Sequence, residues 1–137
     1  MSSILTPVLA LVCLSLVVWI WMYATRIPAM QKAKISPQEG RHAREMGARL
    51  PTSARQVADN YNHLMEQPTI FYALVLYIAL AGISDALFVQ LAWAYVLLRV
   101  VHSLIQCTVN IVMLRFSVFT LSTLVLMVMA ARAVLML

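Results

Sequence analysis

The stretch NYNHLMEQPTIFYAL, residues 60–74, changes from polar to strongly apolar within a few helical turns. Glu66 and Pro68 stand where the apolar part begins. A proline removes a backbone hydrogen bond from a helix, and an ionised carboxylate inside a membrane is costly unless it is paired. The stretch therefore predicts the entry of a helix into a membrane, and it raises the question of what Glu66 contacts there.

The composition is that of an integral membrane protein. Of the 137 residues, 63% are hydrophobic and only 11% are charged, whereas soluble domains carry about 25% charged residues. The length suits one domain, residues 1–137. Most of the ten Lys and Arg residues lie between Arg26 and Arg55, so the basic charge belongs to one loop. We therefore expect membrane lipids around the protein and no nucleic acid as a partner.

Four apolar runs are long enough to span a bilayer, which takes about 20 residues. They predict helices over about 4–24, 54–83, 86–109 and 116–136. Because the later connections are short, neighbouring helices should run antiparallel, and the fold class is an all-α four-helix membrane bundle. Positively charged loops stay in the cytoplasm, which places the loop 25–53 there and both termini outside. Arg132 would then extend to the outer surface.

The basic loop carries local helix signals. Ser36-Pro37-Gln38-Glu39 is typical of a capping box and predicts a short helix that ends near Gly47. His42, within this loop, is expected to be solvated. Ser53 and Gln56 form a second capping-box pattern.

The second spanning helix is predicted to be longer than the membrane is thick. From Ala54 to Ile83 it would measure about 45 Å at 1.5 Å per residue, against a hydrocarbon core of about 30 Å. It should therefore project into the cytoplasm by two to three turns and bend near Pro68.

Polar residues recur at helical spacing on two of the predicted helices. On the second they are Arg55, Asp59, Asn62 or His63, and Glu66; on the third they are Arg99, His102, Ser103, Gln106 and Asn110. Glu66 should lie at a depth similar to that of Arg99 and His102. The two polar faces indicate either an interhelical pair that fixes packing or a site for a polar ligand. His63 could be a ligand contact or part of a solvated face, and the histidine spacing does not indicate a metal site.

The order of these motifs resembles the MAPEG family, the membrane-associated proteins in eicosanoid and glutathione metabolism. The residues that carry the resemblance are Glu66-x-Pro68-x-x-Phe71-Tyr72 on the second helix and Arg99-x-x-His102-Ser103 on the third. The family includes microsomal glutathione transferases and leukotriene C4 synthase, and this chain is similar to its bacterial branch. The resemblance implies a homotrimer in a bacterial inner membrane, with glutathione bound as co-substrate between protomers near the cytoplasmic side.

The resemblance also implies roles for individual residues. Arg26 matches the family's arginine after the first helix, Glu66 its ammonium-binding glutamate, and Arg99 its third-helix arginine. The implied glutathione-binding residues are Arg26, Arg55, Asn62, His63, Glu66 and His102. The implied catalytic residues, which would favour the thiolate, are Arg99, Arg115 and Gln106.

The implied function is that of a glutathione-dependent transferase or peroxidase acting on lipophilic electrophiles. The alternative is a non-catalytic protein on the same scaffold that binds an anionic lipid or another thiol. A small multidrug transporter also has four spans, but that class is expected to carry a glutamate in the first helix, and the run 4–24 has no charged residue.

Overall fold

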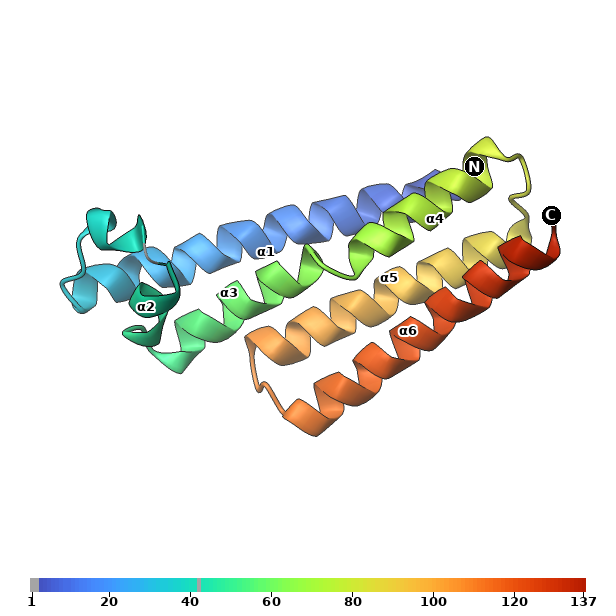
Figure 1. The fold of residues 1–137 in the computed structure, drawn as a ribbon. Helices are drawn as coiled ribbons and strands as arrows, with labels where there is room; N and C mark the ends of the chain where they lie inside the picture. The colour runs from blue at the N-terminus through green and yellow to red at the C-terminus, as the bar shows by residue number, and fades with distance from the viewer. Residues whose placement is uncertain (1–2, 42) are drawn as a thin grey trace.

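The computed structural model describes residues 3–41 and 43–137, so the predicted exposure of His42 lies outside the described residues. This part of the chain forms helices and connections without a β-strand. The helices are α1 (Leu5–Lys32), η1 (Pro37–Arg41), α2 (Ala43–Ala48), α3 (Thr52–Leu64), α4 (Pro68–Leu80), α5 (Ala86–Cys107) and α6 (Val112–Leu135) (Figure 1). Four segments are long and apolar enough to cross a membrane: α1, α3 with α4, α5 and α6. The predicted all-α four-helix membrane bundle is confirmed.

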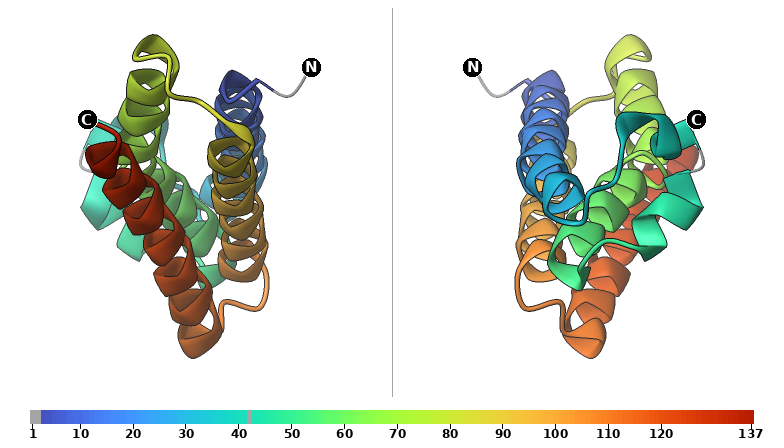
Figure 2. Two further views of the ribbon diagram at one scale, coloured as in Figure 1. Left: turned by 90° about the vertical axis from the view of Figure 1, so that its right-hand side faces the viewer. Right: turned by 90° about the vertical axis from the view of Figure 1, so that its left-hand side faces the viewer.

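Helix α5 contacts α1, α3 and α6, and α4 contacts α1 and α6. Seen along the bundle, α1 and α5 lie on one side and α4 and α6 on the other (Figure 2). Both termini and the connection from α4 to α5 lie at one end, and η1, α2 and the connection from α5 to α6 lie toward the other (Figure 1). This agrees with the antiparallel order that the sequence predicts.

The core is a seam of apolar side chains between the helices, while the outer faces are also apolar. Phe71 of α4 and Tyr95 of α5 stack in the seam with ring centroids 4.5 Å apart. The fully buried apolar residues around them include Leu11, Val18, Val75, Ile78, Phe88 and Met129. Large aliphatic side chains cover the outer faces of all four spans. A helix that is apolar all round suits a lipid environment.

Helix α1 continues to Lys32, about two turns beyond the predicted end near residue 24. Pro28 lies inside the helix, where it removes one hydrogen bond close to the end and does not terminate the helix. The helix stops at a turn in which Lys34 has φ of 57° and the N–H of Ile35 donates to the carbonyl of Met30 at 2.9 Å. The extension keeps Arg26 on a helix beside α3.

The second span is broken at Pro68 into α3 and α4 instead of bending as one helix. Pro68 has no N–H to donate to the preceding turn. The N–H groups of Met65 and Glu66 bond to the carbonyls of Asn62 and His63, three residues back. This tightened turn ends α3, and Pro68 then occupies the first turn of α4, a position that suits proline. The predicted projection remains, since α1 and α3 extend beyond the α5–α6 connection (Figure 1).

The α5–α6 connection is shorter than predicted, because α6 begins at Val112 and not near residue 116. Asn110 has φ of 50°, a conformation that asparagine tolerates better than most residues. Its N–H donates to the carbonyl of Ile105 at 2.7 Å, which closes the turn after α5 ends at Cys107. As a result Arg115 lies on the first turns of α6 and not in a loop.

The two predicted capping boxes have different outcomes. In the first, the N–H of Ser36 donates to Oε2 of Glu39 at 2.9 Å, and the helix that follows is the 3₁₀-helix η1, which ends at Arg41 and not near Gly47. The segment near Gly47 belongs to a separate helix, α2, which ends at Ala48. In the second, Pro51 precedes α3 and makes no side-chain cap. Gln56 instead donates to the carbonyls of Cys107 and Thr108 at 3.1 and 3.0 Å. It thereby bonds the carbonyl end of α5 to α3.

An ion pair joins α6 to the start of α5 at the end that carries the termini. Arg132 binds both carboxylate oxygens of Asp85, at 2.9 and 2.7 Å, and its guanidinium lies 4.5 Å from the ring centroid of Phe88. Asp85 also accepts the N–H of Phe88 and caps α5. The hydrogen bond from Arg132, and then that from Phe88, hold the pKa of Asp85 below its usual value.

We expect Asp85→Asn to lower the unfolding temperature at pH 7, since asparagine keeps the cap but loses the ion pair. The folded-state pKa lies below that of an unfolded Asp, about 3.9. The stabilisation is therefore present above that pH and is lost as the pH falls through the folded-state pKa. Thermal unfolding of the detergent-solubilised protein should show a difference from the parent at pH 7 that shrinks below about pH 4. Equal unfolding temperatures at pH 7 would contradict this.

The charge pattern predicts that the α1–α3 connection is cytoplasmic. In a protein whose Cys13 and Cys107 are replaced by serine, a cysteine at exposed Lys34 should resist a membrane-impermeant maleimide in intact cells. A cysteine at exposed Ser84, at the opposite end, should react with it. The reverse labelling pattern would invert the orientation.

Candidate functional site

The polar face of α5 is buried in the protein, as the sequence predicts. Arg99 is 0% exposed, and His102, Ser103 and Gln106 are each buried. They lie three, four and seven residues after Arg99, which places them on one face of the helix. That face is directed toward α3 and α6, the helices that α5 contacts beside α1.

Arg99 is held by a histidine from α3. Nη2 of Arg99 lies 2.9 Å from Nδ1 of His63. Because a guanidinium has donors only, Nδ1 is the acceptor and the ring proton of His63 is on Nε2. The His63 ring stacks on that of His102 at 4.9 Å and contacts the edge of Phe119 at 4.8 Å. Two histidines and one arginine thus form a compact polar cluster inside apolar helices.

Several buried polar atoms of this cluster have no hydrogen-bond partner among the described residues. They are Nε and Nη1 of Arg99, Nδ1 of His102, Oγ of Ser103 and Oε1 of Gln106. Leaving a buried donor or acceptor unpaired costs about 1–3 kcal/mol, and more for a charged group. Several unpaired polar atoms in one buried cluster mark it as a candidate site for a polar group.

A second network crosses the helix break and was not predicted from the sequence. The hydroxyl of Tyr95 donates to Oε1 of Gln67 at 3.1 Å, and Nε2 of Gln67 donates to Oγ1 of Thr123 at 2.8 Å. Gln67 therefore connects α5 and α6 to the break between α3 and α4. The sequence signal for this role of Gln67 is its position directly before Pro68 at the start of an apolar run.

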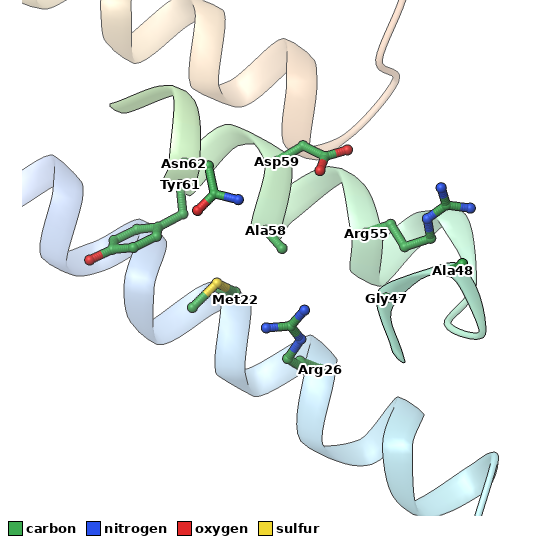
Figure 3. A pocket seen from close by; sticks show the side chains of 9 residues that line it. All are labelled: Met22, Arg26, Gly47, Ala48, Arg55, Ala58, Asp59, Tyr61 and Asn62. Carbon is green, nitrogen blue, oxygen red and sulfur yellow. The ribbon is translucent and has the colours of Figure 1, made fainter. Parts of the chain in front are cut away.

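A cavity of about 510 Å³ lies between α1 and α3. We call it the α1–α3 cavity. Arg26 rises from α1 toward α3, and Arg55 and Asp59 project from α3 (Figure 3). The residues that line it are Met22, Arg26, Gly47, Ala48, Arg55, Ala58, Asp59, Tyr61 and Asn62. Its wall thus has two arginines, one carboxylate and one amide.

A smaller cavity of about 300 Å³ lies on the other side of α3, and we call it the α5–α6 cavity. It is lined by His63, His102, Gln106, Val112, Arg115, Phe116 and Phe119. The buried Arg99 adjoins it through its bond to His63. The arrangement offers a cationic surface next to aromatic and aliphatic side chains.

A scan against protein families matches residues 4–135 to the MAPEG family. The chain belongs to the MAPEG family. A search of curated proteins and a search of solved structures each found no significant match. Family membership and the four apolar helices together make the chain an integral membrane protein of MAPEG type.

Seven of the nine site residues expected of this MAPEG chain line one of the two cavities on either side of α3. Arg26, Arg55 and Asn62 line the α1–α3 cavity, and His63, His102, Gln106 and Arg115 line the α5–α6 cavity. Asn62 and His63 are neighbours in sequence, and consecutive helical residues point about 100° apart. The sequence left open which of them belongs to the polar face, and the structure places one in each cavity.

Glu66 lies in neither cavity of the MAPEG chain. It is exposed on the protomer, and the described ion pairs are Glu39–Arg49 and Asp85–Arg132. The predicted direct contact of Glu66 with Arg99 or His102 is therefore not formed within the protomer. The reason is the break at Pro68: the turn that ends α3 leaves His63, one turn earlier, as the residue that reaches α5.

We expect Arg99→Met to leave the unliganded protein as stable as the parent or more stable. Replacing a whole buried ion pair by apolar side chains of similar volume is often neutral or stabilising by about 1–4 kcal/mol. Arg99 has no carboxylate partner among the described residues, so its replacement leaves no opposite charge unpaired. Thermal or denaturant unfolding of the solubilised protein without ligand measures this. A marked loss of stability would show that the His63 bond and packing of Arg99 outweigh its burial cost.

Proposed function

We propose that this protein binds glutathione and uses its thiolate against lipophilic electrophiles, as a transferase or peroxidase. The observation that carries the proposal is the set of cationic side chains that line both cavities beside α3. Glutathione has two carboxylates, and arginine binds a carboxylate through two parallel hydrogen bonds. Arg26 and Arg55 would hold these carboxylates in the α1–α3 cavity.

The reactive end of glutathione needs a positively charged environment. Lowering a thiol pKa from about 8.5 to about 6.5 takes roughly 2.7 kcal/mol of differential stabilisation. Gln106 is neutral, and a neutral hydrogen bond contributes only about 0.5–1.5 kcal/mol. Arg99 and Arg115 are therefore the groups proposed to stabilise the thiolate, with Gln106 as an additional donor.

In a transfer reaction the thiolate sulfur forms a bond to an electrophilic carbon of the second substrate. The leaving group departs with its electron pair, or the oxygen of an opened epoxide takes a proton from water. With a lipid hydroperoxide, the sulfur attacks the terminal peroxide oxygen and an alcohol leaves, and a second glutathione then forms the disulfide and releases water. Both reactions use the same thiolate.

We further propose that the protein is a homotrimer in which neighbouring protomers complete the site. In support, no residue lines both cavities of one protomer among those that the structure describes. One glutathione molecule would then contact the carboxylate-binding arginines of one protomer and the thiolate-binding residues of a neighbouring protomer. The proposed location is a bacterial inner membrane, with the α1–α3 connection in the cytoplasm.

The second candidate function is binding of an anionic amphiphile without chemistry. A cavity of about 600 Å³ at the C-terminal end of α1 favours it. Arg26 also lines this cavity, beside apolar side chains that include Ile27, Met30 and Ile35. A lipid with an acidic head and an apolar chain would match that lining.

Thiolate formation separates the two functions. Adding glutathione at pH 7 should produce a thiolate absorbance band at about 240 nm, since the thiolate is the reactive form. Arg99→Gln or Arg115→Gln should abolish the band, because one of these charges must supply most of the stabilisation. The exposed Arg49, which pairs with Glu39, provides a control, and Arg49→Gln should retain the band.

A steric variant tests the location of binding. A Cβ added at Gly47 would meet only Nη2 of Arg26, at 4.0 Å, so Gly47→Leu would fill the α1–α3 cavity without removing a charge. It should abolish the increase in unfolding temperature that glutathione causes. Saturable glutathione binding without a thiolate band would contradict the enzymatic proposal and support the binding protein.

A further inference from the structure

One side chain lines two neighbouring cavities. Arg26 belongs to the wall of the α1–α3 cavity and also to the wall of the cavity of about 600 Å³ at the C-terminal end of α1, which we call the α1-end cavity. Consecutive residues of α2 are divided in the same way, since Met46 lines the α1-end cavity and Gly47 lines the α1–α3 cavity. Among the residues that the structure describes, Arg26 alone is common to both linings. The two cavities therefore adjoin at its side chain.

The Arg26 guanidinium has donors that the protein does not use. Its Nε is buried without a hydrogen-bond partner among the described residues. The ion pairs within the described part of the chain are Glu39–Arg49 and Asp85–Arg132, so neither neutralises Arg26. A guanidinium has five N–H donors and no acceptor. A carboxylate that enters either cavity can therefore bind this charge.

The α1-end cavity is otherwise suited to an apolar molecule. Arg26 is the one charged residue in its lining. The apolar side chains around it are Ile27, Met30, Ile35, Pro37 and Met46. Sites for small molecules have volumes of about 300–1,000 Å³ and are mostly apolar with a few polar groups. The lining therefore matches a ligand that has one anionic end and one apolar chain.

Aromatic residues indicate that this cavity lies near the membrane surface. Trp19 and Tyr23 contact each other edge to face, with ring centroids 4.8 Å apart, and both are exposed on α1. Tyr23 also lines the α1-end cavity. Tryptophan and tyrosine are enriched where a membrane meets water, which is also the depth of the charged end of a lipid. A ligand dissolved in the bilayer would thus reach Arg26 with its head at the right level.

We infer that a fatty acid binds in the α1-end cavity through Arg26 and thereby weakens glutathione binding in the α1–α3 cavity. A fatty acid has its carboxylate at the end of a single chain, so head and chain suit one cavity with one cation. A phospholipid has two chains beside its phosphate. The inference rests on the proposed function, in which Arg26 binds a carboxylate of glutathione, and it adds regulation by a long-chain acid.

The physical basis of the inhibition is the sharing of one positive charge. A carboxylate bound to Arg26 from the α1-end cavity neutralises the charge that would attract glutathione. Two carboxylates on one guanidinium also repel each other, since like charges interact strongly at such short range. Glutathione and the fatty acid therefore act on one protein in opposition.

The test measures glutathione affinity by calorimetry on the full-length protein in phosphatidylcholine nanodiscs. Dodecanoic acid should raise the Kd of glutathione at least about fivefold, the lower range of coupling between two sites. Because such coupling is reciprocal, glutathione should raise the Kd of dodecanoic acid by the same factor. Dodecanol, which has the same chain without a carboxylate, should leave the Kd of glutathione unchanged.

Variants assign the effect to the α1-end cavity. Gln31→Trp adds bulk to that cavity and not to the α1–α3 cavity, so it should keep the parent's affinity for glutathione and lose the effect of dodecanoic acid. Ala24→Trp adds the same side chain at an exposed position of α1 that lines neither cavity, and it should retain the effect. Arg26→Gln should bind dodecanoic acid no more tightly than dodecanol. Ile27→Trp is a second filling variant should Gln31→Trp fold poorly, and the unliganded unfolding temperature checks folding of each.

The outcomes distinguish this inference from the proposed function. A parent that binds glutathione and dodecanoic acid without mutual effect overturns the inference and leaves glutathione binding intact. Competition that persists in the filling variants places the acid in the α1–α3 cavity itself and overturns the inference. An equal effect of dodecanol, or competition by phosphatidylglycerol in the nanodisc and not by dodecanoic acid, also overturns the assignment to a fatty acid. A parent that binds dodecanoic acid but no glutathione overturns the proposed function, and the inference fails with it.

Discussion

Burial of the Arg99 guanidinium between apolar helices is the constraint on which the polar arrangement of this protein depends. A charge at membrane depth costs at least about 2.5–3.5 kcal/mol on insertion scales, so its surroundings must supply compensation. His63 of α3 accepts one hydrogen bond from Arg99, and its ring contacts those of His102 and Phe119. The remaining donors of Arg99 have no partner among the described residues. The cluster is therefore costly to the fold, and a bound anion would recover part of that cost.

The helix break at Pro68 makes this cluster compatible with the span. Upstream of the break, α3 carries polar side chains on two sides, one toward α1 and one toward α5 and α6. Downstream, α4 is apolar and packs through Phe71 and Val75. Gln67 at the break bonds to both α5 and α6, so the interruption of the backbone ladder is compensated by side-chain bonds. Within one span, α3 can therefore line the polar cavities while α4 packs as an apolar membrane helix.

The polar residues of the protomer are divided between two cavities. The α1–α3 cavity is lined by two arginines, a carboxylate and an amide, whereas the α5–α6 cavity is lined by two histidines, an arginine and a glutamine beside apolar side chains. In the proposed function, binding of the glutathione carboxylates and stabilisation of its thiolate are therefore assigned to opposite sides of α3. Assembly of copies would bring such complementary halves together, which is why the proposed function and the proposed homotrimer support each other.

The sequence by itself determined the membrane class, the four spans, the buried polar face of α5 and the charge of the first connection, because hydropathy and helical periodicity depend on nearest neighbours along the chain. It also indicated most of the polar residues that line the two cavities. Only the tertiary structure decided that α1 continues past Pro28 to carry Arg26 toward α3, that His63 and not Glu66 reaches Arg99, and that Asp59 joins Arg26 and Arg55. Helical spacing gives the face on which a side chain lies but not the rotation of one helix against another, and that rotation follows from the break at Pro68 and the packing of whole helices.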